Sequence, residues 1–252
     1  MRDPYLLEDA PVLKNLLNIK DADSLERAEA DITSIKLLVV DGAIQSSAFD
    51  LPRLLAIHKH VFGDVYEWAG TLRTIPMVKG ERILGGDTVR YSQPGDIERD
   101  CASVLSKMNE TDWATLSVLE TAEVFAKMVA ELWQAHLFRE GNTRTVITFA
   151  TQFAEAHGFR MDKTLLKDSA AYVRDALVKA SDGQYSEYDY GDRPPANLSW
   201  KAVDDLTMII EMCEPDGVNY STRYFINHSI VTDDWSPRLE NEPLPSWLYL
   251  GY

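Results

Sequence analysis

The sequence predicts an all-α fold, a helical bundle that contains one β-hairpin and is followed by a small C-terminal extension. Apolar residues recur at helical spacing in most of the long stretches. One segment rich in glycine and proline, at about 74–94, breaks this pattern, and near residue 190 the composition shifts to Tyr, Trp, Pro, Asp and Asn. Because 45% of the 252 residues are hydrophobic, the chain can bury a substantial core. We therefore expect a domain over 1–190 and an extension over 191–252.

Two helices are predicted in the first third of the chain. The stretch "DADSLERAEADITSIKLLVV", residues 21–40, has charged residues on one side and an apolar stripe on the other: Leu25, Ala28, Ile32, Ile35 and Leu38. Asp50 is the expected N-cap of the second helix, and Gly70 its expected end. The apolar stripe of this second helix consists of Leu51, Leu54, Leu55, His58, Phe62 and Tyr66.

The segment 74–94 has short β-type runs on either side of a turn at Gly85-Gly86, which predicts an irregular hairpin. After Pro94 the helical pattern returns in four stretches, at 96–110, 117–136, 144–159 and 167–181. The second of these is typical of a central helix because its apolar face is wide, with Val124, Phe125, Met128, Val129, Leu132 and Trp133.

Charge and composition exclude several classes of function. With 40 acidic and 25 basic residues, the net charge of −15 disfavours nucleic acid or an anionic membrane as the main partner. The two cysteines, Cys101 and Cys213, indicate neither a disulfide framework nor a zinc site, and we interpret them as buried thiols. The sequence contains no long apolar run and no signal-peptide pattern, so we expect a soluble protein of the cytosol.

The stretch "HLFREGNTRT", residues 136–145, is the strongest candidate for an active site. A helix is expected to end near His136 and another to begin near Arg144, so that backbone N–H groups point into the intervening loop. Such a helix start binds anions. Gly141 permits close approach of a ligand, and the guanidinium of Arg144 suits phosphate oxygens.

Two further residues of this stretch can take part in chemistry. Glu140 is a suitable ligand for Mg²⁺, which typically uses one or two carboxylates together with phosphates. His136 can accept a proton from an incoming hydroxyl. The combination indicates phosphoryl or nucleotidyl transfer. The alternative is a polar turn in which His136 packs and Asn142 caps a helix, because each residue alone also fits that interpretation.

These residues resemble the Fic (filamentation induced by cAMP) family. Its motif, His-x-Phe-x-Asp/Glu-Gly-Asn-x-Arg-x-x-Arg, matches at His136, Phe138, Glu140, Gly141, Asn142 and Arg144. The stretch "IHKHVFGDVYEWAGTLR" also resembles the segment that precedes the family's hairpin, which is called the flap. The resemblance covers roughly residues 20–185 and implies a Fic-type helical bundle with its flap at about 74–94.

The resemblance implies a protein adenylyltransferase that uses ATP and Mg²⁺ to attach AMP to a Ser, Thr or Tyr hydroxyl of a target protein. His136 would be the general base and Glu140 the metal ligand. Phe138 would anchor the loop, and the phosphates would bind to Gly141, Asn142, Thr143 and Arg144. The flap would dock the target by strand addition, through Thr74, Ile75, Pro76 and Met77. A small antitoxin is a further expected type of partner, and the location would be the bacterial cytosol or, for a secreted effector, a host cytosol.

The sequence departs from the family motif at its last arginine, which is replaced by Ile147. This removes a charge-assisted contact to the nucleotide, typically worth about 1.5–3 kcal/mol. Arg139 is a candidate to compensate. Two alternatives therefore stay open: a module that binds nucleotide with weak or no transfer, and transfer of another group, such as phosphocholine, UMP or phosphate. Phosphate transfer is disfavoured by the resemblance, because Fic-like proteins that transfer phosphate have lysine at the motif position of Thr143.

The sequence contains three minor candidates for functional or packing roles. "SPRLEN", residues 236–241, fits the family's inhibitory pattern with Glu240 as its glutamate, but a capped turn is favoured because the pattern is short and Ile147 removes the arginine that would pair with Glu240. By the resemblance, Tyr172 and Asp182 would lie around the adenine. His58 is predicted to pack in the core, since it and His60 face different sides of one helix.

Overall fold

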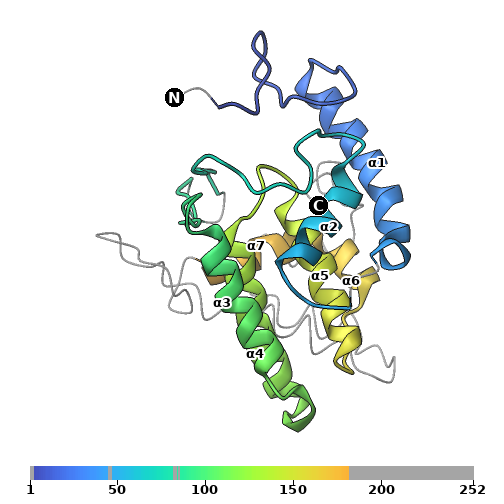
Figure 1. Ribbon diagram of the computed structural model, residues 1–252, viewed down its shortest axis with the longest axis vertical. Coiled ribbons are helices and arrows are strands. Elements are labelled where there is room, and N and C mark those ends of the chain that lie inside the picture. Colours follow the sequence, from blue (N-terminus) through green and yellow to red (C-terminus); the bar gives the residue numbers. More distant parts are fainter. Residues whose placement is uncertain (1–2, 45–46, 82–83, 85, 182–252) are drawn as a thin grey trace, which may run out of the picture.

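The computed structural model describes residues 3–44, 47–81, 84 and 86–181, and within them the fold is all-α, as predicted (Figure 1). The helix α5 runs through the middle of the bundle, packed against α2 and α4. α3 and α7 pack on α4, and α1 packs on α2. The elements are α1 (Ala22–Ala43), α2 (Leu51–Phe62), α3 (Ile97–Glu110), the short 3₁₀ helix η2 (Trp113–Thr115), α4 (Val118–Ala135), α5 (Asn142–Ala156), α6 (Lys163–Asp168) and α7 (Ala170–Ser181).

Local sequence explains where several of these helices begin. The side chains of Asp21 and Asp50 accept hydrogen bonds from backbone N–H groups in the first turns of α1 and α2. α4 begins with a capping box, in which Ser117 and Glu120 each bind the other's backbone N–H. These caps fix the starts of three helices that surround α5.

The core forms where α3, α4 and α5 meet. Phe125 and Phe153 are fully buried and stack on each other, with Trp113 edge-on to both. On α4, the predicted apolar face is confirmed for Phe125, Val129, Leu132 and Trp133, which are at most 1% exposed. Almost every residue of α5 is buried, so this helix can move little.

The apolar stripe predicted for α1 is confirmed at Leu25, which is buried, and Ile32 packs partly buried against the core. It is wrong at Ile35 and Leu38, which are 64% and 84% exposed. The buried residues of this helix are Leu25, Glu29, Thr33 and Val40. The physical reason is that α1 turns a partly polar face inward, because Glu29 and Thr33 bind the side chain of a buried arginine on α5. Hydrophobic periodicity alone could not reveal this, since it assumes that the apolar side faces the core.

Two helix boundaries also differ from the predictions. α2 ends at Phe62 and does not reach Gly70, because the chain turns there and Val65 and Tyr66 both donate to the Phe62 carbonyl, at 2.9 Å. The stretch 167–181 is split between α6 and α7 by a turn at Ser169.

The β-hairpin predicted at 74–94 is not confirmed, as its described residues contain no strand. The chain does fold back there, with the Glu81 N–H donating to the Asp87 carbonyl at 2.8 Å. Upstream of Glu81 the segment is extended, and from Thr74 to Gly80 exposed side chains alternate with half-buried ones. An isolated antiparallel bridge lies instead near the N-terminus, between Leu6 and Leu13.

Several sequence predictions concern residues that the structure does not describe. These are the extension at 191–252, Cys213, Asp182 and the stretch 236–241 with Glu240. Cys101 is a buried thiol, as predicted, and burial raises its pKa to about 12. Among the described helices, none has the length and hydropathy needed to cross a membrane.

Candidate functional site

The loop between α4 and α5 contains the predicted site, and its residues are not helical. α4 ends at Ala135, and His136 follows in the left-handed region with φ 49° and ψ 63°. This conformation is uncommon for a residue other than glycine and often occurs at functional sites. α5 begins only at Asn142, so the loop runs through Glu140 and Gly141.

The side chain of Asn142 closes this loop. Its Oδ1 accepts a hydrogen bond from the Phe138 N–H, and its Nδ2 donates to the Phe138 carbonyl, both at 2.8 Å. Asn142 is 4% exposed, and Phe138 is fully buried beneath the loop, in the anchoring position that was expected. Asn142 was predicted to bind phosphate, but its side chain is used inside the loop, which leaves its backbone N–H for a ligand.

Gly141 is required for space as well as for backbone conformation. Its φ is 80°, and a Cβ at this position would lie 2.2 Å from Cζ of Phe62. The Thr145 side chain donates to the Gly141 carbonyl at 2.9 Å, which holds the start of α5 against the loop. A side chain at residue 141 would therefore displace either Phe62 or the loop.

His58 supports the loop from below, a role that the sequence analysis did not recognise. Its Nδ1 accepts from the Gly70 N–H at 2.8 Å, so Nε2 carries the proton and donates to the Glu140 carbonyl at 3.0 Å. The ring stacks on Phe138, with centroids 3.8 Å apart. Burial, helped by the nearby charge of Arg144, lowers the pKa of His58 to about 3, against the opposing effects of the Glu140 carbonyl and carboxylate.

Arg73 is a second supporting residue that was missed. It is 2% exposed, and its Nε donates to the His136 carbonyl at 2.6 Å. Its other nitrogens donate to the carbonyls of Ile75 and Ser92, so one side chain joins the loop to both arms of the segment 74–94. This role could not be predicted from the sequence, because arginine outside a helix or strand is ordinarily exposed.

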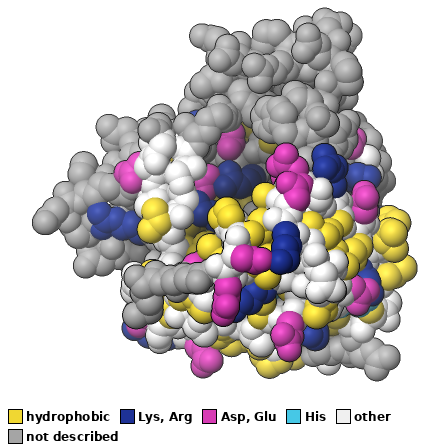
Figure 2. Space-filling model, turned by 90° about the horizontal axis from the view of Figure 1, so that it is seen from above, with side chains coloured by type: hydrophobic (Ala, Val, Ile, Leu, Met, Phe, Trp, Pro, Cys, Tyr) yellow, Lys and Arg dark blue, Asp and Glu magenta, His cyan; other side chains and the backbone are white. Residues whose placement is uncertain are grey.

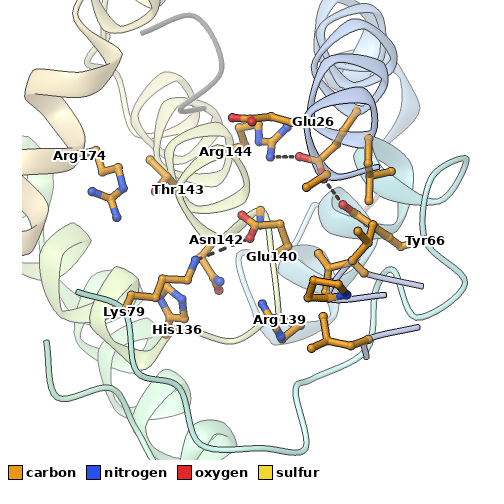
Figure 3. Close-up of a pocket in the computed structure, with 18 of the residues that line it drawn as sticks. Glu26, Tyr66, Lys79, His136, Arg139, Glu140, Asn142, Thr143, Arg144 and Arg174 are labelled. Atoms are coloured by element: carbon orange, nitrogen blue, oxygen red, sulfur yellow. Dashed lines mark hydrogen bonds and ion pairs between the residues drawn. The ribbon is translucent and has the colours of Figure 1, made fainter. Parts of the chain in front are cut away.

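A cavity of about 360 Å³ lies above the loop. It is lined by the loop, by the first turn of α5, by α1, by the N-terminal segment and by Lys79 and Arg174 (Figure 3). On the molecular face shown in Figure 2, Lys and Arg side chains gather in a hollow among acidic and hydrophobic ones. No side chain of the described residues caps the start of α5, so its first N–H groups remain available to an anion, as predicted.

His136 lines this cavity but is only 3% exposed, with its ring stacked on Tyr91 at 3.9 Å. Among the described residues, neither ring nitrogen has a hydrogen-bond partner. Burial lowers the pKa of His136 well below 6.5, and the positive charges of Lys79, Arg73, Arg174 and Arg139 lower it further. A buried, neutral and unpaired imidazole is costly in a folded protein, and it is the form that a general base requires.

Glu140 directs its carboxylate toward the cavity. One oxygen accepts from the Gly141 N–H at 3.0 Å, and the other lies 3.7 Å from the ammonium of Lys79. Burial alone would raise the pKa of Glu140, but Lys79, Arg144 and the Gly141 N–H outweigh this effect and lower the pKa to about 2. The carboxylate is therefore ionised and already faces a cation.

The site suits Mg²⁺ only together with phosphates. Among the described residues, no group of three or more His, Cys, Asp or Glu side chains is placed to hold a metal ion. One ionised carboxylate at the start of an anion-binding helix fits an ion that takes most of its ligands from phosphates and water. We infer that Glu140 would hold Mg²⁺ that arrives with a nucleotide.

Arg144 lines the cavity with its guanidinium already paired. It is 5% exposed, it donates to Glu29 and to Thr33 on α1, and it lies over the ring of Phe62. Glu29 also accepts from the Tyr66 hydroxyl. In this state Arg144 ties α1 to the loop, so the free guanidinium fork that the sequence analysis assumed is not presented.

The other predicted site residues lie around the cavity with varied partners. Thr143 accepts from the Trp133 indole at 2.9 Å, and Arg139 binds the carboxylate of Asp3 at 2.9 Å. Ile147 faces a second, mainly apolar cavity between α1, α5 and α6. Tyr172 is 2% exposed in the core and does not line the site, in contrast to the adenine role expected for it.

The predicted docking residues begin beside the N-terminal segment. The Thr74 N–H donates to the hydroxyl of Tyr5 at 3.1 Å. The Ile75 carbonyl accepts from Arg73, while Pro76 is exposed and Met77 half-buried. Their role in target docking stays a prediction.

Comparison with known proteins identifies the family of this chain. Residues 48–154 match the sequence profile of the Fic/DOC family. The "Probable protein adenylyltransferase y4lH" of Sinorhizobium fredii is 31% identical over 191 residues, which cover 73% of this chain and 90% of that protein. The chain belongs to the Fic/DOC family. The protein adenylyltransferase VbhT of Bartonella schoenbuchensis is 34% identical over 161 residues, and the match covers 64% of this chain but only 32% of VbhT.

Solved structures show the same Fic fold at lower identity. The N-terminal Fic domain of Bep8 from Bartonella sp. 1-1C has a TM-score of 0.64 and 20% identity, over 85% of this chain and 96% of that one. BepC from Bartonella tribocorum, solved with bound AMPPNP, has a TM-score of 0.62 and 23% identity, over 81% and 95%. These likenesses support the arrangement of helices around the motif.

We predict that Gly141→Ala destabilises the protein by about 2–4 kcal/mol, because left-handed backbone strain adds to a clash with Phe62. Gly158→Ala is the matched control, since Gly158 has a similar φ of 88° but nothing within 4 Å of its would-be Cβ. Urea unfolding should show a loss of only about 1 kcal/mol for the control. Equal losses in the two variants would contradict the packing argument.

We also predict that the free energy of unfolding falls as the pH drops from 7.5 to 5. His58 and His136 have lowered pKa values in the folded protein, so the unfolded chain binds more protons below pH 6.5. For His58, whose pKa is about 3 in the folded protein, the cost at pH 5 should be about 2 kcal/mol. His58→Gln should remove about this much of the pH dependence in urea titrations, whereas the control His60→Gln should keep it. An unchanged pH dependence in His58→Gln would show that His58 is not held neutral.

Proposed function

We propose that this chain transfers AMP from ATP to a hydroxyl group of a target protein. The observation that supports this most directly is the buried imidazole of His136, whose two nitrogens have no hydrogen-bond partner among the described residues and lie beside the start of α5. The printed names of y4lH and VbhT describe them as protein adenylyltransferases, which favours the same reaction here. The transfer requires a base, an anion site and a carboxylate, and the loop brings these three groups together.

In the proposed reaction, His136 removes the proton from the target hydroxyl. The hydroxyl oxygen then bonds to the α-phosphorus of ATP, while the bond from that phosphorus to the oxygen bridging the α- and β-phosphates breaks. The leaving pyrophosphate lies on the N–H groups at the start of α5, which neutralise part of its charge. Mg²⁺ held by Glu140 would supply further charge neutralisation.

His136 is well placed for this role because its low pKa keeps it neutral at physiological pH. Arg73 fixes the His136 backbone through its carbonyl, so the ring needs little reorganisation before it accepts a proton. Trp133 and Tyr91 pack against the ring and exclude water from it. The incoming hydroxyl would be the hydrogen-bond partner that the imidazole lacks in the described residues.

The extended segment from Thr74 to Gly80 is the proposed docking surface for the target. Its side chains alternate between exposed and half-buried, as in an edge strand, and Arg73 connects it directly to the loop. A target segment that pairs with this backbone would bring its hydroxyl toward His136. The target protein and a small inhibitory antitoxin are the proposed partners.

We predict that incubation with Mg²⁺ and ATP labelled at the α-phosphate labels the chain itself or a protein in a cell lysate. His136→Ala should reduce the labelling by at least about a hundredfold, since general-base catalysis typically contributes 10²–10⁴-fold. The control His60→Ala removes an imidazole whose ring binds the Lys36 carbonyl on α1, and it should label normally.

Mass spectrometry of the same reactions identifies the group and the target together. Labelling that survives His136→Ala would rule out the assigned base. A wild-type chain that binds nucleotide in calorimetry but labels nothing would assign the binding-module function, which the loss of arginine at 147 and the pairing of Arg144 with Glu29 favour. A parallel reaction with labelled UTP tests whether UMP is the transferred group.

A further inference from the structure

Lys79 brings a positive charge into the cavity from the segment 74–94. Its side chain extends past His136 toward Glu140 (Figure 3). The ammonium nitrogen lies 3.7 Å from a carboxylate oxygen of Glu140, and both side chains are about one third exposed, at 28% and 32%. Lys79 therefore faces the carboxylate that would hold Mg²⁺, although neither the composition nor the motif of the sequence indicated it.

The position of Lys79 is fixed by a buried anchor two residues further along. The Lys79 N–H donates to the Thr88 hydroxyl at 3.0 Å. Glu81, with a side chain only 2% exposed, accepts hydrogen bonds from Arg174 on α7 and from the Tyr91 hydroxyl. Because an unpaired buried carboxylate is strongly unfavourable, this ion pair holds the turn to α7 and keeps Lys79 at the cavity.

Lys79 differs from the other cations that line the cavity. Arg139 is paired with Asp3 at 2.9 Å, Arg174 with Glu81 at 2.8 Å and Arg144 with Glu29. Each of these guanidinium groups makes a close hydrogen bond to a carboxylate. Within the part of the chain that the structure describes, Lys79 makes a contact at 3.7 Å, which is too long for a hydrogen bond, and such partly exposed pairs contribute about 0–1 kcal/mol. Among these four cations, Lys79 can thus leave its partner at the smallest cost.

We propose that Lys79 is a phosphate-binding residue that determines the preference of this site for a nucleoside triphosphate over a monophosphate. Without nucleotide its ammonium neutralises Glu140. With nucleotide and Mg²⁺ bound, Glu140 would hold the metal, and the ammonium of Lys79 would then be free to bind the β- and γ-phosphates. Lys79 thereby provides a charge that the family motif takes from its last arginine, at the position of Ile147 here. This role rests on the proposed function, because it assumes that the cavity binds a nucleotide by its phosphates.

Calorimetry on the full chain in the presence of Mg²⁺ tests this role without relying on activity. The ligands are AMP and α,β-methylene ATP, a triphosphate analogue that cannot be cleaved between its α- and β-phosphates. Lys79→Met keeps much of the side-chain length but removes the charge, and we expect it to weaken triphosphate binding about tenfold to about a hundredfold. AMP binding should change less than about threefold, because AMP lacks the phosphates that Lys79 would bind.

Two further variants separate charge from structure. Lys79→Arg should keep triphosphate affinity within about threefold of the wild type, because it retains a positive charge at the same place. The matched control Lys36→Met removes a lysine that is 29% exposed and pairs with Asp64 outside the cavity, and it should bind both ligands normally.

Each outcome supports or overturns the proposal. Equal weakening of AMP and triphosphate binding in Lys79→Met would indicate a structural role, and unchanged binding of both would show that Lys79 does not contact the phosphates. Impaired labelling of a target with unchanged triphosphate binding would place Lys79 in target docking instead. If the wild type transfers AMP but Lys79→Met binds the triphosphate normally, the role of Lys79 is refuted and the proposed AMP transfer stands. If the wild type binds no nucleotide, both the role of Lys79 and the proposed AMP transfer are refuted.

Discussion

The two hydrogen bonds between the Asn142 side chain and the backbone of Phe138 are the constraint on which the site depends. They close the loop after α4, so that the chain can leave one buried helix and start another within six residues, from His136 to Gly141. Phe138 is thereby held in the core against His58, and Gly141 is held against Phe62, where only a hydrogen fits. With the loop closed, the first N–H groups of α5, the carboxylate of Glu140 and the imidazole of His136 all border one cavity. The functional groups are therefore arranged by packing beneath the loop and not by contacts within the cavity.

The cavity is lined by both basic and acidic side chains, with Glu26 among the acidic ones. Among the described residues, four cations line it, and each faces a carboxylate: Lys79 faces Glu140, Arg139 faces Asp3, Arg144 faces Glu29 and Arg174 faces Glu81. This pairing reconciles an anion-binding function with a chain whose net charge is −15, because the basic groups are concentrated locally while the acidic excess is spread over the whole chain. It also means that a phosphate chain must compete with carboxylates for each cation, so the looser pairs are the ones that a nucleotide can exchange at low cost.

The sequence predicted the helices well where caps and wide apolar faces coincide, as at Ser117 and along α4. It also located the loop and its candidate residues, because glycine, asparagine and arginine between two helical patterns are an unusual combination. The predictions were wrong where tertiary contacts reverse the usual preference for buried apolar and exposed charged side chains. The apolar residues Ile35 and Leu38 are exposed because Glu29 and Thr33 are needed against Arg144, and Arg73 is buried because three carbonyl groups require a donor. The roles of His58 and Lys79 depend on contacts between residues more than sixty positions apart, which periodicity cannot detect.

Three side chains that support the site, those of Arg73, His58 and Asn142, bind carbonyl oxygens of the loop at His136, Glu140 and Phe138. A carbonyl group is present whatever side chain the residue carries. The framework therefore tolerates exchange of the side chains that project from it, and residues such as Arg139 and Thr143 can vary without loss of the loop. Because backbone contacts hold the loop and side chains contact the ligands, single substitutions can change the donor or the target while the backbone geometry of the loop is kept.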